Sequence, residues 1–436
     1  MSIYDKASLV QIPSGYKGGT LYSVVPNTAD GDFTYSGGTN GTRVNKDGLI
    51  ETVAADVPRL NYNFIDGVVQ PDPHLLLEPQ RTNQFTNSEN LANIDFQTNS
   101  TITPDNIIAP NGSLTADKTT QTTGGYLRET VSVSNGTTYS FSVFLKKGYL
   151  RYAVIRSLFS QNGVTPANSN NVFDLDNGSV IYTGTDIVNA SIEAYPNDWF
   201  RCSFVSTASA TGSASFVDFY FSSSSSGTQS SGTSGFGYGW GMQLEAGTYP
   251  TSYIPTTSAA VTRTADSCTK VSFADMPTDY PFTVYWEGQI DDISQNQNAF
   301  SILDTSSAVK YLSFAFANTA YFQVLRRNVN YDIDSQTFPL SVGDILKIGI
   351  AFTSNTTYKC YINGSLIRNE TSGLDVDFDF NDILIGQLRI VSDTGTRNQA
   401  SQFMLFNEAL SDIELETITS YTSFNQMAKA LLYTIE

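Results

Sequence analysis

The pattern that most clearly indicates the fold of this sequence is Tyr139-Ser140-Phe141-Ser142-Val143-Phe144-Leu145. Large apolar side chains recur at every second position, so Tyr139, Phe141, Val143 and Leu145 fall on one face of an extended chain. This period of two is typical of a β-strand that turns one face toward a core.

The same alternation returns at intervals of ten or so residues. Phe200, Cys202 and Phe204 lie on one face of another such run. Asn177-Gly178 and Asn363-Gly364 are dipeptides that favour type I′ hairpin turns between strands. Regularly spaced short strands with such turns predict an all-β protein made of two tandem β-sandwiches of the jelly-roll kind.

Length and local composition predict the domain organisation. A chain of 436 residues holds two or three domains at roughly 100–200 residues each. We expect an irregular N-terminal docking or oligomerisation segment at residues 1–84, a jelly roll at 85–262, a second sandwich at 263–422 and a tail helix at 423–436. The first segment has too few apolar residues for a large core, so it should pack on a neighbour, another copy or a larger assembly.

A short helix is expected after the second sandwich. Ser411 followed by Glu414 forms a capping box, the pattern that begins a helix. Ile413, Leu415 and Ile418 then give it an apolar stripe. The tail helix would expose three apolar side chains that need partners, Met427, Leu431 and Leu432.

Charge excludes several classes of partner. The chain has 24 Lys and Arg against 42 Asp and Glu, a formal net charge of −18. Phosphates of nucleic acid require basic residues, so we expect no nucleic-acid partner. No run approaches the about 20 apolar residues of a membrane span, so no membrane insertion is expected either.

Histidine and cysteine usage limits the chemistry further. The only histidine, His74, lies in a proline-rich connector and was not expected to form a site. Cys202, Cys268 and Cys360 are too far apart for a Cys-x-x-Cys pair and are expected to be free core thiols. The first residues do not form a secretory signal, which predicts synthesis in the cytoplasm.

Candidate metal ligands are few, and no cofactor is predicted. Asp174 to Gly178 is similar to the start of a calcium loop, but the position that should carry its Glu is Thr185, so a hairpin is favoured. Asp375, Asp377 and Asp379 alternate with apolar residues, which favours a solvated strand face over Ca²⁺ binding. Ca²⁺ at a sandwich rim stays open.

Catalytic candidates are equally sparse. Glycoside hydrolysis by the retaining route needs two carboxyl groups about 5–5.5 Å apart. Glu287 and Asp291 are four residues apart, which is about 13 Å along a strand. The sequence therefore predicts a protein that is not an enzyme.

Sugar binding combines aromatic faces with flanking polar groups. Trp199, Trp240 and Trp286 each lie in an apolar strand, which favours core packing. Loops at a sandwich rim are better places for binding residues. The candidate carbohydrate-binding residues form two groups, Tyr149, Arg151 and Tyr152 in the first and Arg326, Arg327, Asn328, Asn330 and Tyr331 in the second. Ordinary surface roles remain the alternative for both.

Short motifs in a fixed order give a resemblance. Residues 7–16, 31–34, 42–51, 58–62 and 75–83 together resemble the opening of bacteriophage tail-fibre and virion-surface proteins. This resemblance implies a virion protein whose N-terminal segment contacts other virion proteins.

Two further segments extend the resemblance over most of the chain. Residues 199–201, 240–245 and 251–256 resemble carbohydrate-binding-module-like jelly rolls, and residues 358–367 and 406–414 resemble a concanavalin A-like, laminin-G-type lectin sandwich. Such a protein is expected in the virion as a homotrimer that binds host-surface polysaccharide. The alternatives are a decoration or adaptor protein without a glycan role and a polysaccharide depolymerase.

Overall fold

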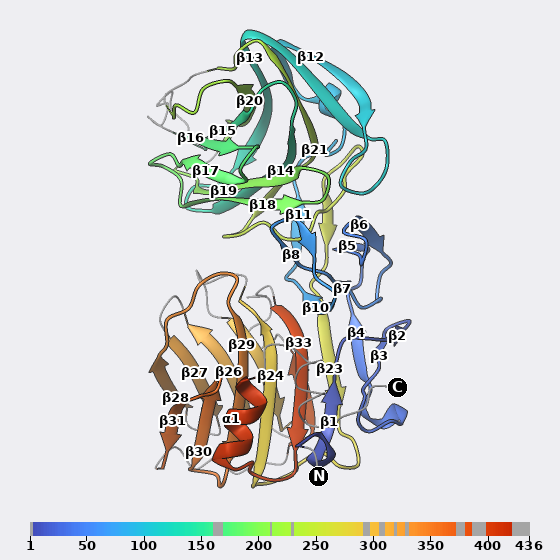
Figure 1. The fold of residues 1–436 in the computed structure, drawn as a ribbon, viewed down its shortest axis with the longest axis vertical. Coiled ribbons are helices and arrows are strands. Elements are labelled where there is room, and N and C mark those ends of the chain that lie inside the picture. The colour runs from blue at the N-terminus through green and yellow to red at the C-terminus, as the bar shows by residue number, and fades with distance from the viewer. Residues whose placement is uncertain are drawn as a thin grey trace.

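The molecule consists of two β-sandwiches stacked along its long axis and joined by a narrow waist (Figure 1). The computed structural model describes residues 3–159, 169–209, 212–227, 231–290, 297–304, 310–317, 321–327, 331–371, 380–385 and 398–420. The predicted all-β fold is confirmed. Within these ranges, no helix has the length and apolar character needed to span a membrane.

The middle sandwich is one antiparallel sheet of ten strands that packs against itself. From one edge to the other the order is β17-β16-β15-β20-β13-β21-β14-β19-β18, with β12 beside β13. Its strands are β12 (Phe96–Ile107), β13 (Ala116–Val133), β14 (Thr138–Lys147), β15 (Tyr152–Leu158), β16 (Asn170–Asp174), β17 (Ser179–Tyr182), β18 (Asn189–Tyr195), β19 (Trp199–Thr207), β20 (Gly212–Ser222) and β21 (Gly235–Ala246).

The long strand β13 connects the two layers of this sandwich. Its first part pairs with β21 and its second part with β20, so the sheet continues from one layer into the other. The core between the layers contains the predicted faces of β14 and β19, including Phe141, Val143, Cys202 and Phe204. The alternation in these strands is therefore confirmed.

The second sandwich is built from two sheets. The first has the order β31-β30-β29-β24-β33-β10-β7, with β1 also beside β33. Its strands are β1 (Ala7–Gln11), β7 (Leu60–Asn61), β10 (His74–Leu77), β24 (Phe282–Gln289), β29 (Ile345–Phe352), β30 (Tyr358–Ile362), β31 (Ser365–Glu370) and β33 (Asn398–Phe406).

The other sheet faces it across a shared core. Its order is β2-β3-β4-β23-β32-β25-β26-β27-β28. Its strands are β2 (Tyr16–Lys17), β3 (Thr20–Leu21), β4 (Phe33–Ser36), β23 (Ser267–Val271), β25 (Gln297–Leu303), β26 (Tyr311–Ala317), β27 (Tyr321–Arg327), β28 (Tyr331–Thr337) and β32 (Asp382–Ile385).

The N-terminal segment supplies strands to the second sandwich. In antiparallel pairs, Val10 of β1 lies opposite Met404 of β33, and Tyr35 of β4 lies opposite Cys268 of β23. The segment places seven side chains in that core, Leu9, Leu21, Phe33, Tyr35, Leu60, Leu75 and Leu77. The middle sandwich is thus inserted between two parts of the second sandwich. Contact of residues 1–84 with another protein stays a prediction.

Small two-stranded sheets form the waist. They are β5 (Gly41–Val44) with β6 (Ile50–Val53), β8 (Phe64–Ile65) with β9 (Val68–Val69), and β11 (Arg81–Asn83) with β22 (Val261–Arg263). Gly48, in the β5–β6 turn, has φ of +78°, and a Cβ there would come within 2.7 Å of Pro196 and Val69. This glycine lets the hairpin pack directly on the middle sandwich.

The hairpin predictions have different outcomes. Asn363 and Gly364 both have positive φ, 48° and 81°, as a type I′ turn requires, and they connect β30 to β31. Asn177-Gly178 lies in a hairpin as predicted, but only Gly178 has positive φ among the two. Asp174 pairs with Ser179, so four residues connect the strands and the predicted two-residue turn is wrong.

Core side chains follow the predictions closely. All three tryptophans, Trp199, Trp240 and Trp286, are buried, and the three cysteines are buried free thiols. His74, which was placed in a connector, is instead the first residue of the buried strand β10.

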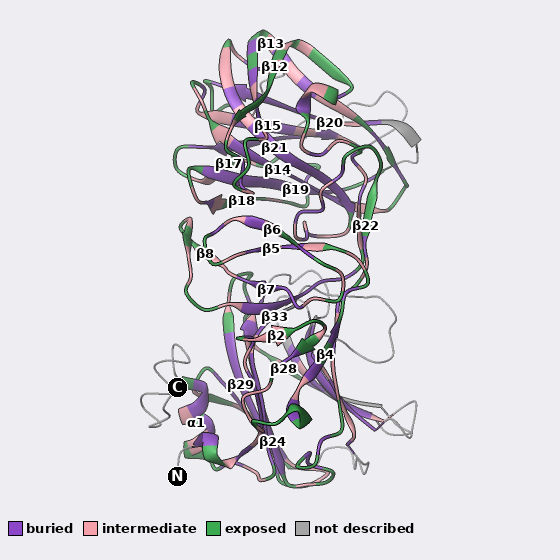
Figure 2. Ribbon diagram, turned by 90° about the vertical axis from the view of Figure 1, so that its right-hand side faces the viewer, coloured by how far each residue is buried: buried purple, intermediate pink, exposed green. Residues whose placement is uncertain are grey.

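One α-helix, α1 (Asp412–Ser420), lies beside the second sandwich (Figure 2). The predicted capping box is present: Ser411 N–H donates to Glu414 Oε2 at 2.8 Å, and Glu414 N–H donates to Ser411 Oγ at 3.4 Å. Leu415 and Ile418 are buried, but Ile413 is 77% exposed and does not join them as predicted. Shorter 3₁₀ turns lie at Ile3–Lys6, Ala29–Gly31 and Leu91–Asn93. The expected tail helix lies outside the described residues.

A partly buried carboxyl group in β13 predicts a pH effect on stability. Burial, together with the nearby charge of Asp95, raises the pKa of Glu129 to about 7, although its hydrogen bond from the Asp95 N–H opposes this. A carboxyl group whose pKa is raised by folding makes its full contribution to stability at pH values below its pKa in the unfolded chain. That contribution is lost as the pH rises through about 7.

We therefore expect Glu129→Gln to flatten the pH dependence of unfolding. The two pKa values set the interval of interest, which runs roughly from pH 5 to pH 8. Over this interval the free energy of unfolding of the wild type should fall by about 1–2 kcal/mol relative to that of the variant, after allowance for solvent screening. Urea unfolding of both proteins at the two pH values measures this difference. The contributions of the other carboxyl groups are the same in both proteins and cancel. Parallel pH profiles would contradict the prediction.

Candidate functional site

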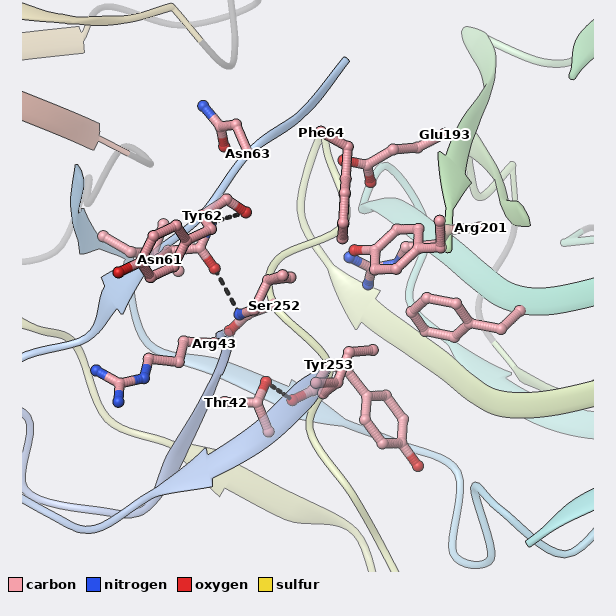
Figure 3. Close-up of a pocket in the computed structure, with 15 residues that line it drawn as sticks. Thr42, Arg43, Asn61, Tyr62, Asn63, Phe64, Glu193, Arg201, Ser252 and Tyr253 are labelled. Atoms are coloured by element: carbon pink, nitrogen blue, oxygen red, sulfur yellow. Dashed lines mark hydrogen bonds between the residues drawn. The ribbon is translucent and has the colours of Figure 1, made fainter. Parts of the chain in front are cut away.

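A pocket opens at the waist, where the N-terminal strands meet the middle sandwich (Figure 3). Together with the open solvent at its mouth, it encloses about 430 Å³. Its lining residues are Thr42, Arg43, Val44, Ile50, Asn61, Tyr62, Asn63, Phe64, Leu76, Phe144, Glu193, Tyr195, Arg201, Ser252 and Tyr253. We call this the waist pocket.

The N-terminal wall of the waist pocket is the chain that follows β7. Val44 N–H donates to the Asn61 side chain at 2.8 Å, and Tyr62 N–H donates to Val44 O at 3.1 Å. Asn63 Nδ2 donates to Gln289 Oε1 of β24 at 2.7 Å. These bonds fix the Tyr62-Asn63-Phe64 stretch between the β5–β6 hairpin and the second sandwich.

Aromatic rings form the opposite wall. The Tyr195 ring of β18 lies 4.6 Å from the Phe64 ring and 5.0 Å from the Phe144 ring, measured between centroids. Glu193, two residues earlier in β18, is exposed. Because side chains two apart in a strand share a face, β18 presents a carboxylate and an aromatic ring to the same space.

A buried arginine lies in the lining of the waist pocket. Arg201 Nη2 donates to Ser142 Oγ at 2.9 Å and to Thr251 O at 2.7 Å, and its guanidinium carbon lies 5.5 Å from the centre of the Phe144 ring. Its Nε has no hydrogen-bond partner in the described part of the chain. Arg43, at the other side, pairs with Glu51 at 2.7 Å. The lining thus combines aromatic faces with donors and acceptors.

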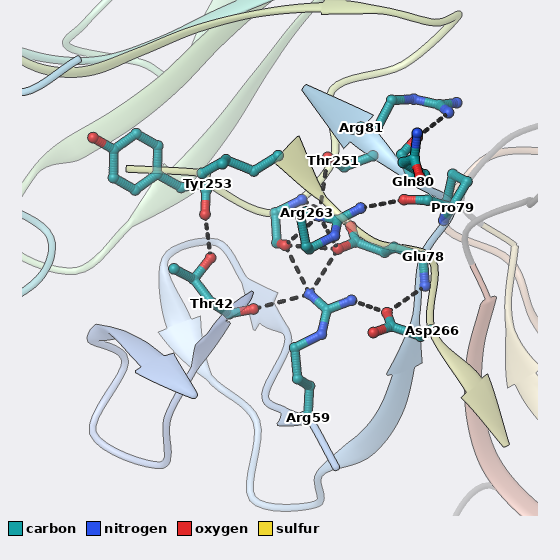
Figure 4. A network of polar contacts seen from close by, with 12 residues as sticks. Thr42, Arg59, Glu78, Pro79, Gln80, Arg81, Thr251, Tyr253, Arg263 and Asp266 are labelled. Atoms are coloured by element: carbon teal, nitrogen blue, oxygen red, sulfur yellow. Dashed lines mark hydrogen bonds and ion pairs between the residues drawn. The ribbon is translucent and has the colours of Figure 1, made fainter. Parts of the chain in front are cut away.

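Beside the pocket lies a buried network of four charged side chains (Figure 4). Glu78 Oε2 is 2.8 Å from Nη1 of both Arg59 and Arg263. Arg59 Nη2 also pairs with Asp266, whose Oδ2 accepts from the Glu78 N–H at 2.8 Å. The charges of two cations and two anions therefore cancel within the junction of the sandwiches.

The network shares residues with the waist pocket. Ser252 Oγ donates to Glu78 Oε2 at 2.6 Å, and Arg59 Nη1 donates to Thr42 O at 3.1 Å. Although burial opposes it, the charges of Asp266 and Glu78 raise the pKa of Arg59. Arg59 is therefore a permanent cation that holds the pocket wall in place.

The first predicted site group is brought together at the rim of the middle sandwich. Tyr149 is 75% exposed, and Arg151 lies over the Tyr152 ring at 5.2 Å. Arg151 Nε and Nη2 donate to the two carboxylate oxygens of Asp174 at 2.8 and 2.5 Å, and this hydrogen bonding lowers the pKa of Asp174. Asp174 thus binds Arg151 within the hairpin. The sequence favoured this hairpin over a calcium loop.

The second predicted group is placed only in part. Arg326 and Arg327 end β27, and Tyr331 begins β28 opposite Arg327. The side chains of these three residues, and the whole of Asn328 and Asn330, lie outside the described part of the chain. Tyr149, Arg151 and Tyr152 do not line the waist pocket.

Sequence reasoning missed the waist pocket because its walls come from distant parts of the chain. Residues 42–64, 144, 193–201 and 252–253 meet only through the fold. The one local signal was the Tyr62-Asn63-Phe64 stretch, which combines aromatic rings with an amide. Nothing in it indicated which strands would lie opposite.

Metal and catalytic candidates find limited support among the described residues. Within them, no cluster of three or more His, Cys, Asp or Glu side chains is arranged to hold a metal ion. Glu287 Oε1 lies 3.9 Å from Lys347 Nζ, and burial raises the pKa of Glu287. Asp291, Asp375, Asp377 and Asp379 lie outside the described ranges.

Comparisons with known proteins give only distant likenesses. No family model matches the chain, and no curated protein matches it. Among solved structures, it is similar to the CBM40 module of Ruminococcus gnavus IT-sialidase bound to α2,3-sialyllactose, with 14% identity, a TM-score of 0.30, and coverage of 33% of this chain and 85% of that one.

Two other solved structures have similar scores. NanB sialidase from Streptococcus pneumoniae is 19% identical, with a TM-score of 0.28 and coverage of 32% of this chain and 24% of that one. The receptor binding domain of botulinum neurotoxin D is 15% identical, with a TM-score of 0.29 and coverage of 35% and 41%. Likenesses at this level carry no argument about the ligand of this chain.

Proposed function

We propose that this protein is a noncatalytic surface protein of a bacteriophage virion, a tail fibre or similar appendage, that attaches the particle to polysaccharide on its host. The N-terminal sequence motifs support the virion part of the proposal. The composition of the waist pocket is the observation that carries the glycan part. We place one sugar unit of the polysaccharide against the mouth of this pocket.

The pocket has the two kinds of surface that a sugar requires. Sugar rings place C–H groups against aromatic faces, and their hydroxyl groups exchange hydrogen bonds with amides, carboxylates and guanidinium groups. Phe64 and Tyr195 provide the rings, and Asn63 and Glu193 lie beside them in the lining. The opposing walls belong to different strands, which the fold holds together. The aromatic face is therefore in position before a ligand binds.

The assembly of several copies is part of the proposal. A homotrimer would present three pockets to one polymer, and repeated binding raises overall avidity without any new contact. Weak binding at each pocket would then suffice for attachment. Light scattering on the purified protein measures the oligomeric state, and a monomer would contradict the trimer.

Removing the aromatic wall tests the glycan site. We expect Phe64→Ala to weaken binding to host polysaccharide by about two- to tenfold, because one aromatic contact is worth about 0.5–1.5 kcal/mol. Phe96→Ala is the matched control, since Phe96 is 53% exposed on β12 and outside the pocket. Binding is measured by biolayer interferometry on immobilised host polysaccharide, with circular dichroism to verify the fold.

Each result has a defined consequence. Loss of affinity in Phe64→Ala but not in Phe96→Ala supports the pocket. Equal affinity in all three proteins contradicts it as the site. Failure of the wild type to bind any host polysaccharide would favour a decoration or adaptor protein, and release of reducing ends would establish a depolymerase.

A further inference from the structure

A second cluster of aromatic and basic side chains lies on the layer of the middle sandwich that includes β13, β20, β15, β16 and β17. Its members are Tyr126, Arg128, Tyr152, Arg156, Tyr182 and Tyr220, which we call the arginine–tyrosine face. The waist pocket contacts β14, β18 and β19 instead. The two sites therefore belong to different strands of the sandwich.

Strand register brings the two arginines of this face together. Asp218 of β20 lies opposite Arg128 of β13 on one side and Arg156 of β15 on the other. Arg128 Nη2 is 2.9 Å from Asp218 Oδ2, and Arg156 Nη2 pairs with the same oxygen. Two guanidinium groups on one buried carboxylate leave a local charge of +1 in a chain whose net charge is −18.

The arginines remain accessible although their shared partner is not. The side chains of Arg128 and Arg156 are 25% and 19% exposed, whereas Asp218 is fully buried. The hydrogen bonds of Arg128 to described residues both go to Asp218, from Nε and Nη2. Its Nη1 therefore keeps its two donors for a ligand.

Aromatic rings flank this cationic centre. The Arg128 guanidinium carbon lies 5.0 Å from the centre of the Tyr126 ring and 3.5 Å from that of the Phe216 ring. Tyr152 and Tyr182, both half-buried, pack against the cluster of Val154, Val172 and Tyr220. Tyr152 also contacts Arg151, so the rim group predicted from the sequence continues into this face.

We propose that the arginine–tyrosine face binds a polysaccharide whose sugars carry a carboxylate. A guanidinium group matches a carboxylate through two parallel N–H donors, which a neutral sugar does not exploit. The half-buried rings of Tyr126 and Tyr152 offer surfaces for the sugar rings, whereas the backbone of Gly227 packs on the Tyr182 ring. This site goes beyond the waist pocket proposed above and does not depend on it.

The negative charge of the chain restricts where an acidic polymer can bind. An acidic polymer is repelled by most of a surface with net charge −18. Binding therefore needs a place where positive charge is held by the fold. Asp218 fixes both arginines there, so the cost of ordering their long side chains is met before the ligand arrives.

Titration calorimetry of the full chain tests the proposal with three probes, namely trigalacturonic acid, a trimannuronate and a hyaluronan hexasaccharide. The methyl ester of trigalacturonic acid is the matched neutral probe. We expect at least one acidic probe to bind, with roughly tenfold weaker binding of Arg128→Gln and weaker binding at high salt. Arg156 still pairs with Asp218 in this variant, so the fold should be kept.

Control variants separate this site from the others. Arg368→Gln removes an arginine of similar exposure, paired with Asp334 at 2.8 Å in the second sandwich, and should bind like the wild type. Tyr126→Ala should weaken binding without any change of charge. Phe64→Ala should have no effect here, which distinguishes this site from the waist pocket. The proposal is overturned if no acidic probe binds, if the methyl ester binds equally well, or if Arg128→Gln binds like the wild type.

Discussion

Glu78→Ala is expected to lower the free energy of unfolding by about 3–5 kcal/mol, because it removes the anion shared by two buried arginines. Glu78 is fully buried, and its Oε2 lies 2.8 Å from both Arg59 and Arg263. Without it, only Asp266 remains to balance the two guanidinium groups. Truncating one partner of a buried ion pair leaves charge that neither water nor protein compensates.

Urea unfolding followed by circular dichroism measures this loss. Asp412→Ala is the matched control, because Asp412 pairs with Lys359 at 2.7 Å on the surface, with its side chain 54% exposed. Exposed pairs contribute about 0–1 kcal/mol. If both variants lost the same small amount, the buried network would not stabilise the junction as we infer.

A chain that begins at residue 85 is expected to lose the second sandwich and keep the middle one. Removal of residues 1–84 deletes six of its strands, β1, β2, β3, β4, β7 and β10. It also empties the positions of Leu9, Phe33 and Leu75 in the core. Large apolar side chains cost about 2–5 kcal/mol each when truncated in a core, so several at once exceed the stability of an ordinary domain.

Limited proteolysis of the shortened chain distinguishes the two sandwiches. The core between the two layers of the middle sandwich lies within residues Phe85 to Leu244, so a fragment spanning residues 85–262 should resist digestion and unfold cooperatively. Fluorescence of Trp286, buried in the second sandwich, should shift to that of an exposed indole. Protection of residues 263–420 in the shortened chain would show that the N-terminal strands are dispensable.

Alternation along single strands was predictable because it is local. The period of two in residues 139–145 required only that every second side chain reach a core, and Phe141 and Val143 do so. The capping box at Ser411 is equally local. The turn at Asn177 was not, because the Arg151–Asp174 pair and a four-residue connection come from the packing of the hairpin rather than from the dipeptide.

The sites also differ in whether their residues are close in sequence. Arg151 and Tyr152 are neighbours in sequence, and their contact was within reach of sequence reasoning. The waist pocket and the arginine–tyrosine face depend on strand order. Arg128, Arg156 and Asp218 are scattered over ninety residues and meet because β20 lies between β13 and β15.

The all-β class, the buried tryptophans and thiols, and the helix start could be predicted from the sequence, because each follows from propensity or side-chain period over a few residues. The role of residues 1–84, which complete the last sandwich around an inserted middle one, emerged only from the folded chain. Strand pairing joins residues hundreds of positions apart, as Val10 with Met404. No local pattern specifies such a partner, since any exposed strand edge offers the same backbone donors and acceptors.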